Sequence, residues 1–219
     1  MTHTSSAPLP IVVLISGNGS NLQSIIDACI NGSINAEIKA VISNKADAFG
    51  LKRAQNAEIT THVIDHTQYN ERSKFDSALS LLIDKYEPGL VVLAGFMRIL
   101  TEEFVNHYLG RMLNIHPSLL PNFQGLHTHQ RAIDSGVNEH GVSVHFVTPE
   151  LDGGPVANRA SVNVKPGDTA RQLATRVLEQ EHRIYPETID WFAKGRLKLE
   201  NNQAILDGHP VPQLDKIFA

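Results

Sequence analysis

The chain has 219 residues, of which 42% are hydrophobic and 19% are charged. This length can bury the core of one large domain without disulfides or structural metals, and the composition excludes a disordered chain. The formal net charge of −4 argues against a protein that binds nucleic acid or a membrane surface through a basic face. The single cysteine, Cys29, excludes an internal disulfide framework and is typical of a reducing compartment.

The first ten residues are polar, and we expect them to form a flexible leader before a single domain over residues 11–219. The apolar run at 11–15 is too short for the core of a signal peptide. No segment approaches the ~20 apolar residues of a membrane span. These observations predict a cytoplasmic protein with no membrane partner.

Strand-like and helix-like segments alternate in the first half of the chain. The expected strands are short apolar runs at 11–15, 38–42, 62–64, 90–94 and 112–115. The expected helices lie around 22–29, 46–56 and 71–86. This alternation predicts an α/β fold with a Rossmann-like, mostly parallel sheet flanked by helices. Ligands of such sheets bind beyond the carboxyl ends of the strands, here after residues 15, 94 and 115.

The second half predicts strands at 141–147 and 159–164 joined by a turn at 152–155, and therefore a mixed sheet in the C-terminal part. A long helix is expected from 168 towards 184, where Pro186 should end or kink it. A small hairpin is expected around Asp207 and Gly208.

The loop after the first strand contains Gly17 and Gly19, followed by Ser20 and Asn21. The glycines let the backbone approach a ligand, and Ser20 or Asn21 can cap a helix whose free N–H groups favour an anion. The alternatives are a monophosphate cradle and a plain tight turn. The loop is not a dinucleotide fingerprint, because Leu22 stands where a third glycine is expected.

The loop after the fourth strand is rich in apolar residues: Phe96, Met97, Ile99 and Leu100. These side chains either pack inward or line an apolar pocket for a flat heterocycle.

The fifth strand carries Asn114 and His116, which are two residues apart and therefore share one face. An amide donor beside an imidazole suits an oxyanion and a proton, although such a pair can also be structural. Asp152 precedes two glycines, so it is either a carboxylate aimed by a sharply folded loop or the first residue of an Asx-turn.

Glu181 continues the apolar stripe of the long helix, four residues after Val177. A buried carboxylate is costly unless it is paired, so Glu181 meets a core arginine or faces a ligand pocket. Cys29 lies on the apolar stripe of its own helix and is interpreted as inert core.

A metal site would draw on the histidines and on Asp152. The candidate ligands are His116, His127, His129, His145 and Asp152. Since no helical His-x-x-x-His or cysteine-rich spacing supports such a site, we expect no metal.

Four segments, 14–22, 93–100, 113–121 and 141–155, occur in an order that resembles the folate-dependent phosphoribosylglycinamide formyltransferases. The resemblance runs from residue 11 to about residue 186 and implies the formyltransferase fold. It implies transfer of a formyl group from 10-formyltetrahydrofolate, as co-substrate, to the amine of 5-phosphoribosylglycinamide. No metal, nucleic acid or covalent enzyme intermediate is implied, and the choice between monomer and homodimer stays open.

The resemblance also implies residue roles. The catalytic residues would be Asn114, His116 and Asp152. The ribonucleotide would contact Gly19, Ser20, Asn21 and Glu181. The folate would contact Arg72, Met97, Arg98, Ile99, Leu100, Asn114 and Val147. Leu178 departs from the family pattern, where a polar residue lies near the phosphate, so that one contact is in doubt.

Three alternative functions share this pattern. A formyltransferase acting on methionyl-tRNA would need an added basic domain, and a formyltetrahydrofolate hydrolase would need an added N-terminal domain, so the chain length disfavours both. A non-catalytic folate- or nucleotide-binding protein with the same fold is disfavoured by the intact trio of Asn114, His116 and Asp152.

Overall fold

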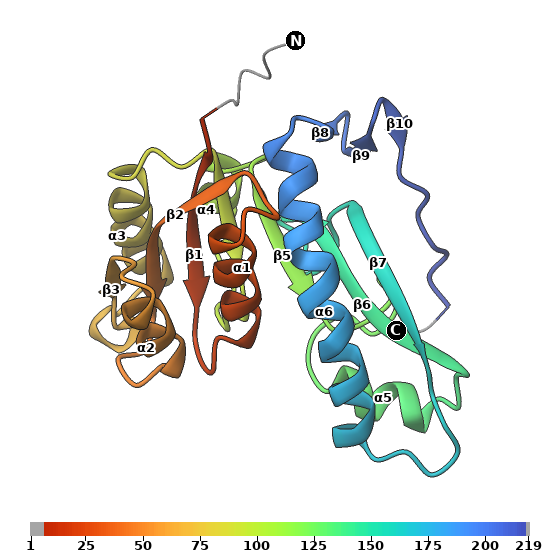
Figure 1. Cartoon of the computed structure of the whole chain (residues 1–219). Coiled ribbons are helices and arrows are strands. Elements are labelled where there is room, and N and C mark those ends of the chain that lie inside the picture. The colour runs from red at the N-terminus through yellow and green to blue at the C-terminus, as the bar shows by residue number, and fades with distance from the viewer. Residues whose placement is uncertain (1–6, 218–219) are drawn as a thin grey trace.

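The computed structural model describes residues 7–217. Its centre is a seven-stranded sheet with the order β3-β2-β1-β4-β5-β6-β7 (Figure 1). The strands are β1 (Leu9–Ile15), β2 (Ala36–Ser43), β3 (Thr61–Val63), β4 (Leu90–Leu93), β5 (Met112–His116), β6 (Glu139–Phe146) and β7 (Val156–Asn163). The first five pair in parallel, whereas β6 pairs antiparallel with β5 and β7. The expected mostly parallel sheet with a mixed C-terminal part is confirmed.

Helices cover both faces of this sheet (Figure 1). They are α1 (Ser20–Ile30), α2 (Phe49–Asn56), α3 (Arg72–Asp84), α4 (Glu102–His107), α5 (Thr128–Asp134) and α6 (Ala170–Ala193), with a 3-10 turn η1 (His66–Gln68). A small antiparallel sheet follows, made of β8 (Leu197–Glu200), β9 (Gln203–Leu206) and β10 (His209–Pro210). The hairpin expected at Asp207 and Gly208 joins the last two of these strands.

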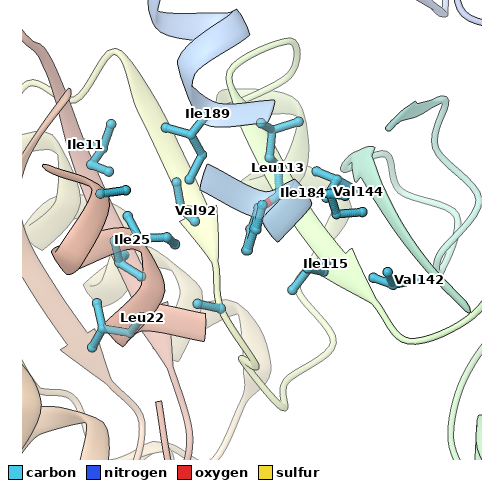
Figure 2. Packing of buried hydrophobic residues seen from close by; sticks show 14 of the residues in the cluster. Ile11, Leu22, Ile25, Val92, Leu113, Ile115, Val142, Val144, Ile184 and Ile189 are labelled. Atoms are coloured by element: carbon cyan, nitrogen blue, oxygen red, sulfur yellow. The ribbon is translucent and has the colours of Figure 1, made fainter. Parts of the chain in front are cut away.

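Alternate residues of each central strand feed two separate cores. In β1, Ile11, Val13 and Ile15 belong to the core under α1 and α6. Val12 and Leu14 belong to the core under α3 and α4. Figure 2 shows the first core, where side chains from α1 and α6 lie over strand residues of β4 and β5. Strands buried on both faces explain the continuous apolar runs of the sequence.

Helix α6 continues through Pro186 to Ala193, so this proline does not end the helix, which was one of the two expected outcomes. A proline inside a helix costs about 3 kcal/mol. Ile184, Tyr185 and Ile189 around it are all fully buried against the sheet, which offsets that cost. The Tyr185 hydroxyl also contacts two strand carbonyls, those of Leu93 (3.0 Å) and Leu113 (3.1 Å).

Several boundaries differ from those expected. Strand β1 begins at Leu9, so Leu9 and Pro10, expected in the leader, pair with Ala36 and Glu37 of β2. Residues 1–6 of that leader lie outside the described residues. Helix α2 begins at Phe49 rather than at residue 46, and the short helices α4 and α5 were not expected. Within residues 7–217, no helix is both long and apolar enough to cross a membrane.

Candidate active site

The loops after β1 and β4 meet at the carboxyl edge of the sheet. The Ser16 backbone N–H donates to the Gly95 carbonyl (3.1 Å), and the Ser16 hydroxyl accepts from the Met97 N–H (2.7 Å). The same hydroxyl donates to the side chain of Asn44 at the end of β2 (2.6 Å). The contacts of Ser16 with Gly95 and Met97 join two of the three loops that the sequence singles out.

Asn114 and His116 both lie on β5, where strand geometry aligns their side chains as expected. The Asn114 amide nitrogen lies 3.1 Å from Nε2 of His145, its cross-strand neighbour on β6. The Nδ1 of His145 lies 2.9 Å from the Phe146 carbonyl oxygen, so Nδ1 carries the proton and Nε2 accepts from Asn114. Burial lowers the pKa of His145, which keeps this acceptor neutral.

His116 is held between a carbonyl and a carboxylate. Its Nε2 lies 3.0 Å from the Phe123 carbonyl oxygen, and its Nδ1 lies 3.5 Å from Oδ2 of Asp152. Asp152 Oδ2 also accepts a hydrogen bond from the Gly125 N–H (3.0 Å), and Oδ1 lies 3.8 Å from Nε2 of His145. The structure thus brings Asp152, from the turn after β6, together with Asn114 and His116 of β5.

Sequence reasoning missed three groups of this cluster. His145 was considered only as a metal ligand, and nothing in the sequence indicated the Phe123 carbonyl or the Gly125 N–H. The residues 123 and 125 have positive φ values of 57° and 80°. A glycine at 125 is the one local signal of this folded loop.

The loop after β1 leads into α1 in a way that differs from the prediction. We expected Ser20 or Asn21 to cap the helix, but Gly19 occupies the N-cap position and no side chain caps it. Ser20 and Asn21 lie in the first turn instead, so the N–H groups of that turn are open to an anion. Arg53, which the sequence did not single out, donates from its guanidinium to the Asn18 carbonyl (2.8 Å) and side-chain oxygen (2.9 Å).

Glu181 is buried beside this first turn of α1. Its Oε2 accepts from the Asn21 side-chain amide (2.6 Å), although the two residues are 160 positions apart. The partner is therefore an amide and not the core arginine that the sequence left open. Burial raises the pKa of the Glu181 carboxyl, and the hydrogen bond from Asn21 opposes that rise.

The apolar loop after β4 has two parts. Phe96 and Leu100 pack into the core under α3 and α4. Met97 and Ile99 are 63% and 55% exposed, so they are available to line a binding surface. Arg98 lies over the Phe75 ring, with 5.6 Å between the guanidinium carbon and the ring centroid.

Two further residues of the expected folate set lie on other elements. Arg72 is exposed at the start of α3. Val147 directly follows β6 and packs at the border of the core under α3 and α4.

The histidines considered as metal ligands do not form one cluster. His127 is the N-cap residue of α5, and His129 Nδ1 lies 3.2 Å from Nε2 of His140. Among residues 7–217, no group of three or more His, Cys, Asp or Glu side chains could hold a metal ion.

The chain is similar to known proteins over most of its length. A family model described as formyl transferase matches residues 9–189. Phosphoribosylglycinamide formyltransferase of Escherichia coli (strain K12) is 58% identical over 202 residues, 92% of this chain and 95% of that protein. The solved structure of phosphoribosylglycinamide formyltransferase from Coxiella burnetii has a TM-score of 0.90 and 58% identity, covering 94% of this chain and 96% of that one. The crystal structure of glycinamide ribonucleotide transformylase 1 from Symbiobacterium toebii also has a TM-score of 0.90. It is 43% identical and covers 94% of this chain and 97% of that one.

Proposed function

Because this chain belongs to the phosphoribosylglycinamide formyltransferase family, whose enzymes act in purine biosynthesis, we propose the following substrates and residue roles for it. The enzyme transfers the formyl group of 10-formyltetrahydrofolate to the amine of 5-phosphoribosylglycinamide. The observation that carries the proposal is the cluster of Asn114, His116 and Asp152 at the sheet edge where the ligands of α/β sheets bind.

Asn114 and His116 stabilise the transition state. Attack of the substrate amine on the formyl carbon builds a tetrahedral oxyanion. Asn114 uses one amide N–H to contact His145, which leaves its second N–H to donate to that oxygen. His116 in its cationic form adds a positive charge near that oxygen, while its two ring nitrogens face the Phe123 carbonyl and Asp152. The neutral His145 thereby fixes the orientation of the Asn114 amide.

Asp152 orients His116 and assists the proton transfer. Its carboxylate faces Nδ1 of His116, and the Gly125 N–H holds it in place. The negative charge stabilises an imidazolium in contact with it. A proton then passes, directly or through a water molecule, from the reacting amine to the departing folate nitrogen.

The binding residues lie around this cluster. The open N–H groups of Gly19, Ser20 and Asn21 would take the ribonucleotide phosphate, and Arg53 adds a positive charge to the same loop. Glu181 would contact the polar part of the same substrate. The folate would lie against the backbone and exposed side chains of residues 97–100, with Arg72, Asn114 and Val147 as further contacts.

A turnover assay tests the proposal against the alternatives. We expect an absorbance change on mixing enzyme, formyl-folate and glycinamide ribonucleotide, and none when the ribonucleotide is left out. Formyl loss without the ribonucleotide would indicate a hydrolase. Binding of both ligands without any turnover would indicate a non-catalytic binding protein.

A further inference from the structure

Residues 211–217, here called the C-terminal strap, run from β10 along the outer side of β7, the edge strand of the main sheet (Figure 1). The Gln213 side chain forms two hydrogen bonds with the backbone of Val156, accepting from its N–H (3.0 Å) and donating to its carbonyl (3.1 Å). The Arg159 guanidinium donates to the Pro212 carbonyl. The strap is therefore fixed to the edge that β7 would otherwise leave unpaired.

The far end of the strap holds the loop between β5 and α5. The Asn122 side chain donates to the Asp215 carbonyl (3.2 Å) and accepts from the Ile217 N–H (2.7 Å). Asn122 is only 8% exposed, so its amide needs these partners. The Lys216 ammonium donates to the side-chain oxygen of Gln124 (3.2 Å).

The same loop positions the active-site pair. The Phe123 carbonyl is the partner of His116 Nε2, and the Gly125 N–H donates to the Asp152 carboxylate. The Gln124 amide donates to the Asp152 carbonyl (3.2 Å). The strap is thus connected to His116 through residues 122 and 123, and to Asp152 through Gln124.

Besides these bonds, the Gln213 side chain ties the strap to Val156, the residue directly after the turn at 152–155. A pocket of about 260 Å³ lies between the strap and this turn, lined by Pro121, Gly153 and Leu214 among others. Phe123 also has a φ of 57°, a conformation that persists in non-glycine residues only where the surroundings enforce it. The bonds at residues 122 and 124 therefore add to the contacts that hold this loop, such as those from the Ser118 hydroxyl to the Asn122 carbonyl (2.7 Å) and from the Arg131 guanidinium to the Gln124 carbonyl (2.6 Å).

We propose that the strap is a positioning element for the reaction, with Asn122 and the Ile217 N–H as its positioning groups. By holding residues 122–125, it sets the distances from the Phe123 carbonyl and the Gly125 N–H to His116 and Asp152. This inference rests on the proposed function of that pair. It predicts that loosening the strap lowers kcat while substrate binding at residues 19–21 and 97–100 is retained.

The test removes one N–H and leaves the active-site loop intact. Ile217→Pro deletes the donor to Asn122, whereas Ile217→Ala keeps the donor and loses only an exposed side chain, so it is the matched control. A misplacement of about 1 Å can cost on the order of 100-fold in rate, so we expect a fall in kcat of roughly tenfold for Ile217→Pro. KM for both substrates should stay within about twofold, and Ile217→Ala should match the wild type. Asn122→Ala removes this bond together with the one to the Asp215 carbonyl, so it should lower kcat by at least as much.

A double-mutant cycle with Asp152→Asn separates positioning from a merely structural role. If the strap acts through the His116–Asp152 pair, Ile217→Pro should lower kcat by less than about twofold in a protein that already carries Asp152→Asn, because that pair is then disabled. An equal cost in both backgrounds, or an unchanged kcat in Ile217→Pro and Asn122→Ala, overturns the inference. Wild-type turnover in Asp152→Asn alone would instead refute the proposed function on which it rests.

Discussion

Asp152→Asn isolates the charge that the proposed mechanism requires. Asp152 has a φ of 48°, in the left-handed region that asparagine also tolerates, so the backbone of the turn should be preserved. The amide oxygen of the variant can still accept from the Gly125 N–H. The substitution therefore removes the negative charge beside His116 and little else.

The size of the effect follows from the distance between the two groups. At 3.5 Å, two unit charges interact by about 5 kcal/mol at an effective dielectric constant of about 20. The side chains of His116 and Asp152 are only 8% and 10% exposed, so salt screens them little. Since about 1.4 kcal/mol is worth tenfold in rate, a fall in kcat on the order of 10³-fold is the upper bound, reached if the whole attraction acts in the transition state alone. The amide dipole retains part of the interaction, so we expect a fall of at least about 100-fold.

The assay measures kcat and both KM values from the absorbance of the folate substrate. Asp207→Asn is the matched control, because Asp207 also has a left-handed backbone (φ 52°) and an ionic partner, Arg196, on an exposed hairpin. It should leave kcat unchanged, since exposed ion pairs contribute little. A kcat for Asp152→Asn within a fewfold of the wild type would mean that Asp152 only shapes its turn, and the mechanism would be wrong.

Three other outcomes follow from the geometry. Glu181→Gln keeps an oxygen that can accept from Asn21 but removes the charge, so KM for the ribonucleotide should rise while the melting temperature and KM for the folate stay nearly constant. A Cβ at Gly19 would lie 2.6 Å from the Gly50 Cα, so Gly19→Ala should lower the melting temperature, whereas Gly17→Ala, with nothing within 4 Å, should not. Burial, with His129 nearby, lowers the pKa of His140 to about 4. As the pH falls from about 6.5 to about 5, this histidine therefore takes up a proton in the unfolded chain but not in the folded one, which should lower the free energy of unfolding by about 2 kcal/mol. Denaturant titrations at both pH values should show this loss for the wild type and not for His140→Gln.

The central strands β1, β4 and β5 were predictable because they are largely buried on both faces. An apolar run such as 90–94 has few other interpretations when turn residues flank it, and β4 covers Leu90–Leu93. Helices α4 and α5 have six and seven residues, too short for a helical period to stand out. The one local signal for α4 was Thr101, whose hydroxyl caps the helix by accepting from the Phe104 N–H, followed by two acidic residues.

The parts of the active site that the sequence could not predict depend on contacts between residues far apart in the chain. Asn114 and His116 could be placed on one face because the two-residue period of a strand is local. The partner of Asn114 is 31 residues away, and the partner of Glu181 is on α1, 160 residues away. The position of Glu181 on an apolar stripe predicts that its carboxylate has a partner, because a buried carboxylate without one is costly. Only the packing of α1 on α6 decides that this partner is Asn21.

The two glycines of the loop after β1 differ in a way that the sequence does not reveal. From the sequence, Gly17 and Gly19 have the same interpretation, an open backbone that lets a phosphate approach. The structure separates them, because Gly19 has a φ of 73° and packs against Gly50, whereas the space at Gly17 is empty of protein atoms within 4 Å. Gly19 is therefore needed to fold the loop onto α2, whatever binds there. A loss of ribonucleotide binding in a Gly19 variant would therefore also report on that fold, whereas a side chain at Gly17 meets no protein atom, so a loss of binding in a Gly17 variant would report on the ligand.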